Sequence, residues 1–458
     1  MRFVPHSKGQ SVDMTKGNPY VLIFKFALPV FLSQLFQQLY NTADTFIVGE
    51  FLGTEALAAV SSSGNLIFLM ISFFEGLALG AGIVISRYFG AGQHERVSHA
   101  IHTNLAFGLV SGAFLSVFGV AFTPTFLGWM NVDAEVMPLA VEYFRYYYYG
   151  AVAMVMYNVC RGIMNALGDS RRPLYYLIFS SLLNVALDLL FVGVLGGGVK
   201  WAAIATVISQ AASVVLCLMH LCRANSEFRV EFRKIRFHGE ILGEVVRYGF
   251  PSGVQNSVIG LANVVLQSQV NSFGKLAMAA FGTQAKIEGF AFMPITGFNM
   301  ALTTFIGQNL GAREYERAKK GARFGILAAV VLAEIIGVLY YIFCPELMAL
   351  FDDTPRVIEI GVMHARTTAL FYFLLAFSHS VAAVCRGAGK AFVPMTVMLS
   401  VWCVIRLIYV MSVMHFFGEI KYIFMAYPIT WIISSVIYLL YYCLSDWVHG
   451  FERRRSNG

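Results

Sequence analysis

Long hydrophobic stretches alternate with short polar connections along the whole chain. Twelve of them reach about 20 residues, the length of helix that crosses the hydrocarbon core of a bilayer. Six lie in the first half of the sequence, at 20–48, 58–87, 100–125, 138–163, 174–195 and 200–222. Six lie in the second half, at 249–272, 277–308, 322–344, 359–385, 392–417 and 422–445. The pattern predicts an all-α integral membrane protein with twelve transmembrane helices.

The composition excludes a soluble protein. Hydrophobic residues make up 58% of the 458 residues and charged residues only 13%, whereas a soluble globular chain carries roughly 25% charged residues. The seven cysteines lie mostly inside hydrophobic stretches and form no CxxC motif, so we expect neither a metal site nor a disulfide framework. The first stretch is too long for a removable signal peptide, so we expect it to be retained as a span.

Positive charge is concentrated on alternate connections. One set of connections, which includes both ends of the chain, carries 25 Lys and Arg residues, and the other set carries only Lys200, Lys275, Arg356 and Lys421. Basic residues near span ends are retained on the cytoplasmic side. We therefore expect a multi-pass plasma-membrane protein, in the inner membrane of a bacterium, with both termini cytoplasmic. The net charge of +7 then reflects topology, and nucleic-acid binding has no support.

The two halves of the sequence are related by a shift of 221 residues. This shift aligns 85–96 with 306–317, with identity at 5 of 12 positions, and it also aligns 52–60 with 273–281. Because each half holds six spans, the repeats are parallel, as in many transporters. We predict an N-terminal lobe at 1–230, with spans one to six, and a C-terminal lobe at 231–458, with spans seven to twelve. The basic stretch 223–247 connects the two lobes.

Three features carry a resemblance to a known family: the repeated Gly-Ala turn after spans two and eight, the run LGTEALAA from Leu52, and the segment 161–173. The chain resembles the multidrug and toxic compound extrusion (MATE) family over nearly its whole length. The resemblance implies an antiporter that exports amphipathic, often cationic, organic compounds in exchange for H⁺ or Na⁺. It also implies a monomer in membrane lipid that needs no cofactor and catalyses no reaction.

Polar residues inside spans are costly in hydrocarbon and are candidates for function. Asp44 in span one, Asp188 in span five and Thr206 in span six lie about 7, 10 and 9 Å from the outer ends of their spans, at 1.5 Å per residue. Asn184 precedes Asp188 by four residues and Asn41 precedes Asp44 by three, so each carboxylate has an amide on its own helix face. The family resemblance implies that Asp44, Asn184, Asp188 and Thr206 form the cation or proton site.

The sequence leaves the chemistry of this group open. Two neighbouring carboxylates in a poorly hydrated cavity repel each other, which favours holding one proton between them. The same oxygen atoms could ligate Na⁺, because hard cations prefer oxygen donors. A third interpretation is that the two aspartates are structural and only stabilise helix contacts.

A second group of polar residues suggests a substrate cavity. Glu288 lies about 16 Å into span eight, near the middle of the membrane. It either lines a cavity or pairs with Arg366 or Arg406. Glutamines and an asparagine form a polar stripe along span one, so the predicted cavity residues are Gln34, Gln37, Asn41 and Glu288.

Pro29 interrupts span one. Proline removes a helical hydrogen bond, so the span should kink there. The kink is either a hinge between transport states or a fixed feature of packing.

Two other functions compete with the antiporter. A lipid-linked oligosaccharide flippase of the same wider superfamily would need a cationic cavity, whereas the predicted first-lobe site is acidic. A membrane-embedded enzyme would need a catalytic motif, and the sequence has no HExxH and no GxSxG. The longest connection, at 223–248, is too short for a catalytic domain.

Overall fold

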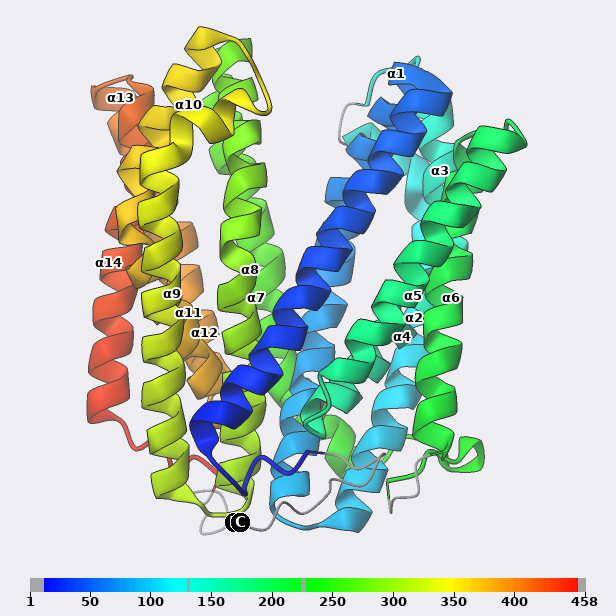
Figure 1. Cartoon of the computed structure of the whole chain (residues 1–458), viewed down its shortest axis with the longest axis vertical. Helices are drawn as coiled ribbons and strands as arrows, with labels where there is room; N and C mark the ends of the chain where they lie inside the picture. Colours follow the sequence, from blue (N-terminus) through cyan, green and yellow to red (C-terminus); the bar gives the residue numbers. More distant parts are fainter. Residues whose placement is uncertain (1–11, 130–131, 224–227, 452–458) are drawn as a thin grey trace. The chain divides into compact units, whose positions relative to one another are not determined.

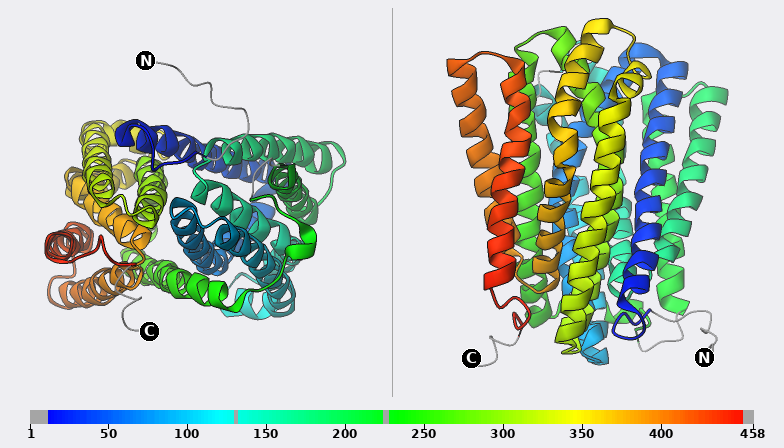
Figure 2. Two further views of the ribbon diagram at one scale, coloured as in Figure 1. Left: turned by 90° about the horizontal axis from the view of Figure 1, so that it is seen from below. Right: turned by 60° about the vertical axis from the view of Figure 1, so that its left-hand side comes forward.

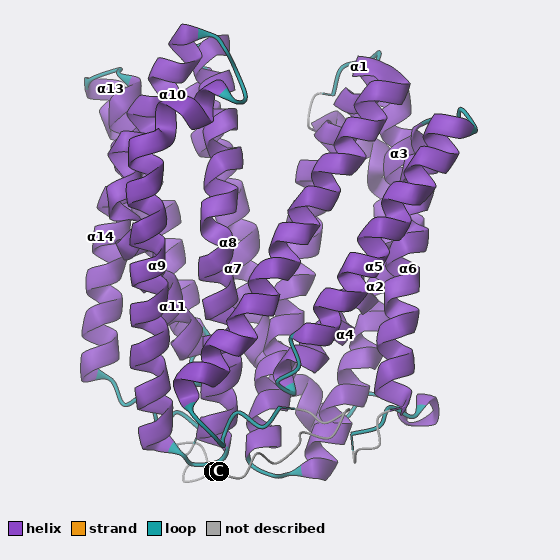
Figure 3. Cartoon of the chain, viewed as in Figure 1, coloured by secondary structure: helices purple, strands orange, loops and turns teal. Residues whose placement is uncertain are grey.

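The computed structural model describes residues 12–129, 132–223 and 228–451, without the side chains of 61–71. Helices dominate this part of the chain, and none of it is strand (Figure 3). All twelve predicted spans fall on helix, which confirms the all-α fold class. By length and composition alone, nine helices among the described residues could cross a membrane.

Three predicted spans are not among the nine. The first two predicted spans lie in one continuous element, α1 (Pro19–Gly90), which is broken only at Gly53, and the second of them includes 61–71, whose side chains lie outside the described part of the chain. The fourth span is divided at Gly150 into α3 (Met137–Tyr149) and α4 (Ala151–Ala166), each short on its own. The seventh span, in α7 (Gly239–Asn271), carries many polar residues and is not among the nine.

The described chain forms two compact units. The first unit contains Leu32–Gly253, and the second combines Met14–Phe31 with the chain from Val254 onward. Each of α1 and α7 therefore contributes its first part to one unit and its remainder to the other. The predicted lobes at 1–230 and 231–458 follow the sequence repeat, whereas the units exchange the segments that begin the first helix of each repeat.

The first unit is a bundle of helices that run beside one another (Figures 1 and 2). α2 packs on α3 and α4, and α6 packs on α3, α4 and α5. Besides those already given, its elements are α2 (His94–Trp129), α5 (Arg171–Asp188), the π-helical turn η1 (Leu189–Val194), α6 (Val199–Arg223) and the short 3₁₀ helix η2 (Phe232–Lys234).

The second unit has its core between α8, α9 and α11, with α10 on α8 and α9, and α14 on α11 and α13. Large buried side chains such as Phe305, Tyr372 and Phe424 fill this core. The helices are α8 (Lys275–Gly311), α9 (Tyr315–Ala349), α10 (Pro355–Thr368), η3 (Ala369–Phe371), α11 (Tyr372–Gly387), α12 (Phe392–Met398), η4 (Leu399–Ile405), α13 (Arg406–Phe416) and α14 (Ile420–Leu444).

The backbone confirms the sequence repeat. Residues with positive φ recur in pairs separated by 221 positions, and a fourth pair is separated by 222. The φ angles are 85° and 93° at Gly53 and Gly274, 65° and 61° at Gly92 and Arg313, 86° and 73° at Gly168 and Gly389, and 63° and 64° at Gly196 and Gly418. Helices therefore end in the same way at matching positions of the two halves.

Gly92→Ala should lower the free energy of unfolding by about 1 kcal/mol, because an L-residue pays to adopt positive φ. No atom lies within 4 Å of a Cβ built at Gly92, so the cost is purely conformational. Gly243→Ala is the matched control, since that glycine also has open space but lies inside α7. The control should be neutral or stabilising. Thermal unfolding of the purified variants measures both, and equal shifts would contradict the expectation.

The repeated segments 85–96 and 306–317 bind the chain at the beginning of α7 and just before the beginning of α1, respectively. In the first unit, the Tyr88 hydroxyl donates to Glu244 Oε2 of α7 (2.7 Å), and Arg96 Nη1 donates to the Tyr88 hydroxyl (3.2 Å). In the second unit, Arg317, which aligns with Arg96, donates from Nη2 to the Met14 carbonyl (3.1 Å). The repeated segments thus hold in place the parts of the chain that the two units exchange.

The described ends of the chain lie at the same end of the second unit. Gln308 Oε1 accepts a hydrogen bond from the Met14 backbone N–H (2.9 Å). The His449 ring packs on Tyr315, with ring centroids 4.7 Å apart. Gln308 lies in the last turn of α8 and Tyr315 begins α9, so both contacts are made where these two helices meet, as an even number of spans requires. Which side of the membrane this end faces remains a prediction.

α1 and α7 meet backbone to backbone in the first unit. A Cβ at Gly76 would lie 2.2 Å from the Gly253 nitrogen, and one at Gly80 would lie 2.2 Å from the Gly249 nitrogen. Both helices thus present a Gly-xxx-Gly pair at the crossing, the pattern that lets membrane helices approach most closely.

The segment 228–238 of the predicted basic connection packs on α2. The Glu231 backbone N–H donates to His102 Nε2 (3.1 Å), and the His238 backbone N–H donates to the Thr103 hydroxyl (3.2 Å). Phe228 is buried, and its ring stacks on His94. Residues 224–227 lie outside the described part of the chain.

Candidate cation site and substrate cavity

The structure brings the four predicted coupling-site residues together in the first unit. α1 supplies Asp44, α5 supplies Asn184 and Asp188, and α6 supplies Thr206. The Asp44 side chain is 8% exposed and Asp188 is fully buried. The two carboxyl groups lie within hydrogen-bonding reach of each other. Depth along three separate helices was therefore a sound guide to which side chains meet.

Asn184 links the two sides of this cluster. Its amide nitrogen donates to Asp188 Oδ2 (2.8 Å), and its amide oxygen accepts from the Thr206 backbone N–H (3.2 Å). The Thr206 hydroxyl donates to the Ala202 carbonyl one turn earlier in α6 (3.2 Å). These bonds fix the orientation of the amide, with its nitrogen toward Asp188 and its oxygen toward Thr206.

One oxygen of each carboxyl group has no described partner. Asp44 Oδ1 and Asp188 Oδ1 are both buried without a hydrogen bond among the described residues. Buried polar atoms of this kind normally have a partner, so each such exception needs an explanation. A proton shared by the pair, or a small cation between their oxygens, would satisfy both atoms.

Three tyrosines around the pair were not predicted. The Tyr40 hydroxyl lies within hydrogen-bonding reach of Thr206, and Tyr143 and Tyr147 of α3 lie close enough to Asp44 to interact electrostatically. Helical spacing was the available signal. Tyr40 precedes Asp44 by four residues, and Tyr143 precedes Tyr147 by four, so each pair shares a helix face.

The polar stripe along α1 differs in detail from the expectation. Asn41 is exposed, and its Oδ1 accepts from Gln37 Nε2 (3.4 Å). Among the described residues, Asn41 forms no hydrogen bond with Asp44. Its amide was expected beside the Asp44 carboxylate but is turned toward Gln37. Gln34 is partly buried in the same helix.

The helix changes geometry directly after Asp188. α5 ends at Asp188, and the π-helical turn η1 follows it. A π-helical turn inserts an extra residue into the helix and is frequent at functional sites. It alters the direction of the residues that follow Asp188 relative to a continuous α-helix.

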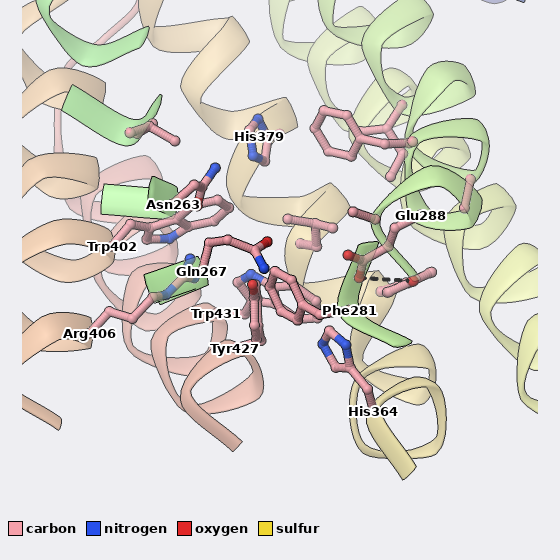
Figure 4. Close-up of a pocket in the computed structure, with 18 residues that line it drawn as sticks. Asn263, Gln267, Phe281, Glu288, His364, His379, Trp402, Arg406, Tyr427 and Trp431 are labelled. Carbon is pink, nitrogen blue, oxygen red and sulfur yellow. Dashed lines mark hydrogen bonds between the residues drawn. The ribbon is translucent and has the colours of Figure 1, made fainter. Parts of the chain in front are cut away.

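The second unit contains a cavity of about 450 Å³ that Glu288 lines (Figure 4). Six of the 18 residues that line the cavity are Phe, Tyr or Trp and two are His, and α7, α8, α10, α11, η4, α13 and α14 all contribute to its walls. A volume of this size lies within the roughly 300–1,000 Å³ of typical small-molecule sites. The other predicted cavity residues, Gln34, Gln37 and Asn41, belong to the first unit.

Glu288 is bonded to a tyrosine rather than to an arginine. The Tyr372 hydroxyl donates to Glu288 Oε1 (3.0 Å). Neither Arg366 nor Arg406, the two arginines considered as partners, forms an ion pair with Glu288 among the described residues. Arg366 lies instead over the Tyr341 ring (5.6 Å), and Arg406 lies over the Trp402 and Tyr427 rings (4.8 Å each). Glu288 therefore lines a cavity and is bonded to Tyr372, and its part in binding substrate stays a prediction.

The described residues contain no group of three or more His, Cys, Asp or Glu side chains that could hold a metal ion. The oxygen donors that could bind Na⁺ are two carboxylates, an amide and a hydroxyl, which together suit a hard cation.

The MatE family profile matches residues 29–190 and 251–412. These two matches lie at nearly the same offset as the sequence repeat, and they begin at Pro29 and Pro251. They confirm that each half of the chain is one copy of the family's unit. The chain is accordingly a multi-pass membrane protein with two parallel repeats.

Similar proteins cover nearly the whole chain. The probable multidrug resistance protein YoeA of Bacillus subtilis is 29% identical over 427 residues, which are 91% of this chain and 92% of that protein. The probable multidrug resistance protein YpnP of the same organism is 25% identical over 96% of this chain and 98% of its own. A MOP superfamily transporter from Pyrococcus furiosus has the same fold, with a TM-score of 0.88, 24% identity and coverage of 94% and 96%. The predicted resemblance is confirmed, and the chain belongs to the MatE family of membrane transporters.

Proposed function

We propose that the protein exports amphipathic organic compounds, often cationic, in exchange for H⁺ or Na⁺. Multidrug efflux is supported by relatives that carry the name of multidrug resistance proteins along nearly the whole chain. The exchange mechanism is supported by one observation above all, the buried Asp44–Asp188 pair with an unpartnered oxygen on each carboxyl group.

The carboxyl pair is the proposed coupling site. Two buried carboxylates at hydrogen-bonding distance cannot both remain charged without compensation. Binding of H⁺ or Na⁺ compensates them, and Asn184 and Thr206 contribute further oxygen atoms. The loaded and empty pairs differ in charge and in side-chain separation, so ion binding favours one arrangement of α1, α5 and α6 over another.

The proposed hinge is Pro29. α1 stays helical through this residue, and two residues later the helix passes from the second unit into the first. Pro251 lies at the matching position of α7, two residues before that helix passes between the units. A proline weakens the helical hydrogen bonds around it, so bending costs least there.

The flippase alternative has less support. The relatives described above carry the names of multidrug resistance proteins, and the coupling-site cluster is acidic rather than cationic. Transport without a chemical reaction also agrees with the family, whose members are transporters.

The test is reconstitution of the purified chain in liposomes with a fluorescent cationic dye. A pH gradient and a Na⁺ gradient are imposed separately, each without the other. We expect one gradient to drive dye movement against its concentration and so to identify the coupling ion. Movement under neither gradient would contradict the antiporter, and lipid scrambling in the same liposomes would then support the flippase.

A further inference from the structure

An arginine is buried in the membrane part of the second unit without an acidic partner. Arg406 lies near the middle of the Phe392–Phe416 span and is only 3% exposed. The described salt bridges do not include it. A charged side chain at this depth is costly and indicates a function by default.

Neighbouring side chains fix the position of the Arg406 guanidinium group, but the described hydrogen bonds do not use all of its N–H donors. Arg406 Nε and Nη2 donate to the Thr430 hydroxyl (3.2 and 2.7 Å), which itself donates to the Ala426 carbonyl (2.7 Å). Its carbon lies 4.8 Å from the centroids of both the Trp402 and Tyr427 rings. A guanidinium has five N–H donors, and the described hydrogen bonds use none from Nη1. The fork is thus oriented by its neighbours, with donors left for an acceptor in the cavity.

Glu288, the acidic group of the cavity, lies across the cavity from Arg406. Figure 4 shows Arg406 and Glu288 apart, with Gln267, Tyr427 and Trp431 drawn between them. Glu288 interacts electrostatically with Arg406 but is hydrogen-bonded to Tyr372. The charge of Arg406 is therefore not neutralised by direct contact with the cavity's own carboxylate.

Two histidines add further unpartnered polar atoms. His364 is 2% exposed, and neither of its ring nitrogens has a hydrogen bond among the described residues. Nε2 of His379 is likewise buried without a partner. Both residues line the cavity. His364 also stacks nearly parallel on Phe281 (ring planes at 1°), so the polar atoms are set in an aromatic wall.

We propose that this cavity binds planar aromatic organic anions. The aromatic ring lies against the walls formed by residues such as Phe281, Trp402 and Tyr427, and the acidic group accepts hydrogen bonds from Arg406. An arginine fork binds carboxylate or phosphate oxygens in two-point contacts. The cavity would thus extend the substrate class beyond the cationic compounds of the proposed function. Only the claim that the bound anion is exported rests on that proposal.

Binding is measured on the purified full-length chain in lipid nanodiscs, with no ion gradient. Flavin mononucleotide is the probe, and riboflavin is its control, because the two share one fluorescent ring and differ in the phosphate. Stacking on Trp and Tyr should quench the fluorescence of both. We expect flavin mononucleotide to bind at least about tenfold more tightly than riboflavin, the effect of one or two charge-assisted hydrogen bonds. Equal affinities in the wild-type protein would overturn the proposal.

Arg406→Gln should remove the preference for flavin mononucleotide and leave riboflavin binding within about twofold, which also shows that the cavity is still folded. Arg406→Lys should keep part of the preference, since it keeps the charge but loses the fork. Arg356→Gln is the matched control, because that arginine is exposed and paired with Glu359 (2.6 Å) outside the cavity. A full preference retained in Arg406→Gln would overturn the assignment.

Glu288→Gln separates the two sides of the cavity. It should leave the affinity for flavin mononucleotide unchanged or higher, because it removes a negative charge across the cavity. Loss of flavin mononucleotide binding in this variant would place the ligand at Glu288 instead and overturn the role of Arg406. These binding results do not depend on gradient-driven dye transport, so the two proposals can fail separately.

Discussion

Asp188→Asn is expected to reduce gradient-driven dye export by at least about tenfold, to the level of empty liposomes. Asparagine has nearly the same shape and can still accept from Asn184, but it neither binds a proton reversibly nor attracts a cation. Without that change of charge, ion binding no longer favours one arrangement of α1, α5 and α6, so the gradient cannot drive export. The rate of dye movement under the gradient identified for the wild-type protein measures the effect.

The control for this variant is another carboxylate of the first unit. Glu75 lies in α1 and pairs with Arg161 (3.5 Å), which is not a residue of the cluster. Glu75→Gln should retain most of the export rate, since a partly exposed ion pair contributes little. Asp44→Asn should behave like Asp188→Asn. Full export by both aspartate variants at wild-type protein levels would show that the pair is structural, as one interpretation of the sequence holds.

Gly249→Leu is expected to disrupt the first unit, at a cost of at least about 3 kcal/mol, the upper part of the usual range for overpacking. A Cβ at Gly249 would lie 2.7 Å from both the Leu77 Cα and its carbonyl oxygen. These are backbone atoms, so no side-chain rotation can relieve the clash. The helices must separate, and they lose the close contact that stabilises a Gly-xxx-Gly crossing.

The matched control is Gly243→Leu, six residues earlier in the same helix, where a Cβ meets no atom within 4 Å. This variant should be purified in normal yield. The measurement is the fraction of each variant that elutes as a single species, together with its thermal unfolding midpoint. Similar midpoints for the two variants would show that α1 and α7 are not in close contact at this point.

The sequence predicted the helices and the repeat because both depend on local pattern. Hydrophobic length identified the spans, and the repeat aligned 52–60 with 273–281, where Gly53 and Gly274 both adopt positive φ. The exchange of Met14–Phe31 between units was not predicted, since it depends on contacts between residues some 300 positions apart, such as Met14 and Arg317. Hydrophobic pattern carries no information about such distant pairs.

The candidate sites were predictable to different degrees. The depth of a residue along its span indicated that Asp44, Asp188 and Thr206 lie at a similar level in the membrane. This was calculable because each residue of a helix adds a known rise. The side to which Asn41 turns was not predictable, since it depends on rotation of α1 against its neighbours. Arg406 was considered only as a partner for Glu288, and its aromatic surroundings became visible only when α13 and α14 were placed together.

The exchanged segments also constrain the order of folding. As the chain is synthesised, the first unit lacks the beginning of α7 until residues beyond 239 emerge, and Met14–Phe31 stays without its binding site until the α8–α9 connection exists. A chain cut within 223–247 would yield two fragments, neither of which contains a complete unit. The gene could therefore be divided at its repeat boundary only if both products were made together and assembled on one another.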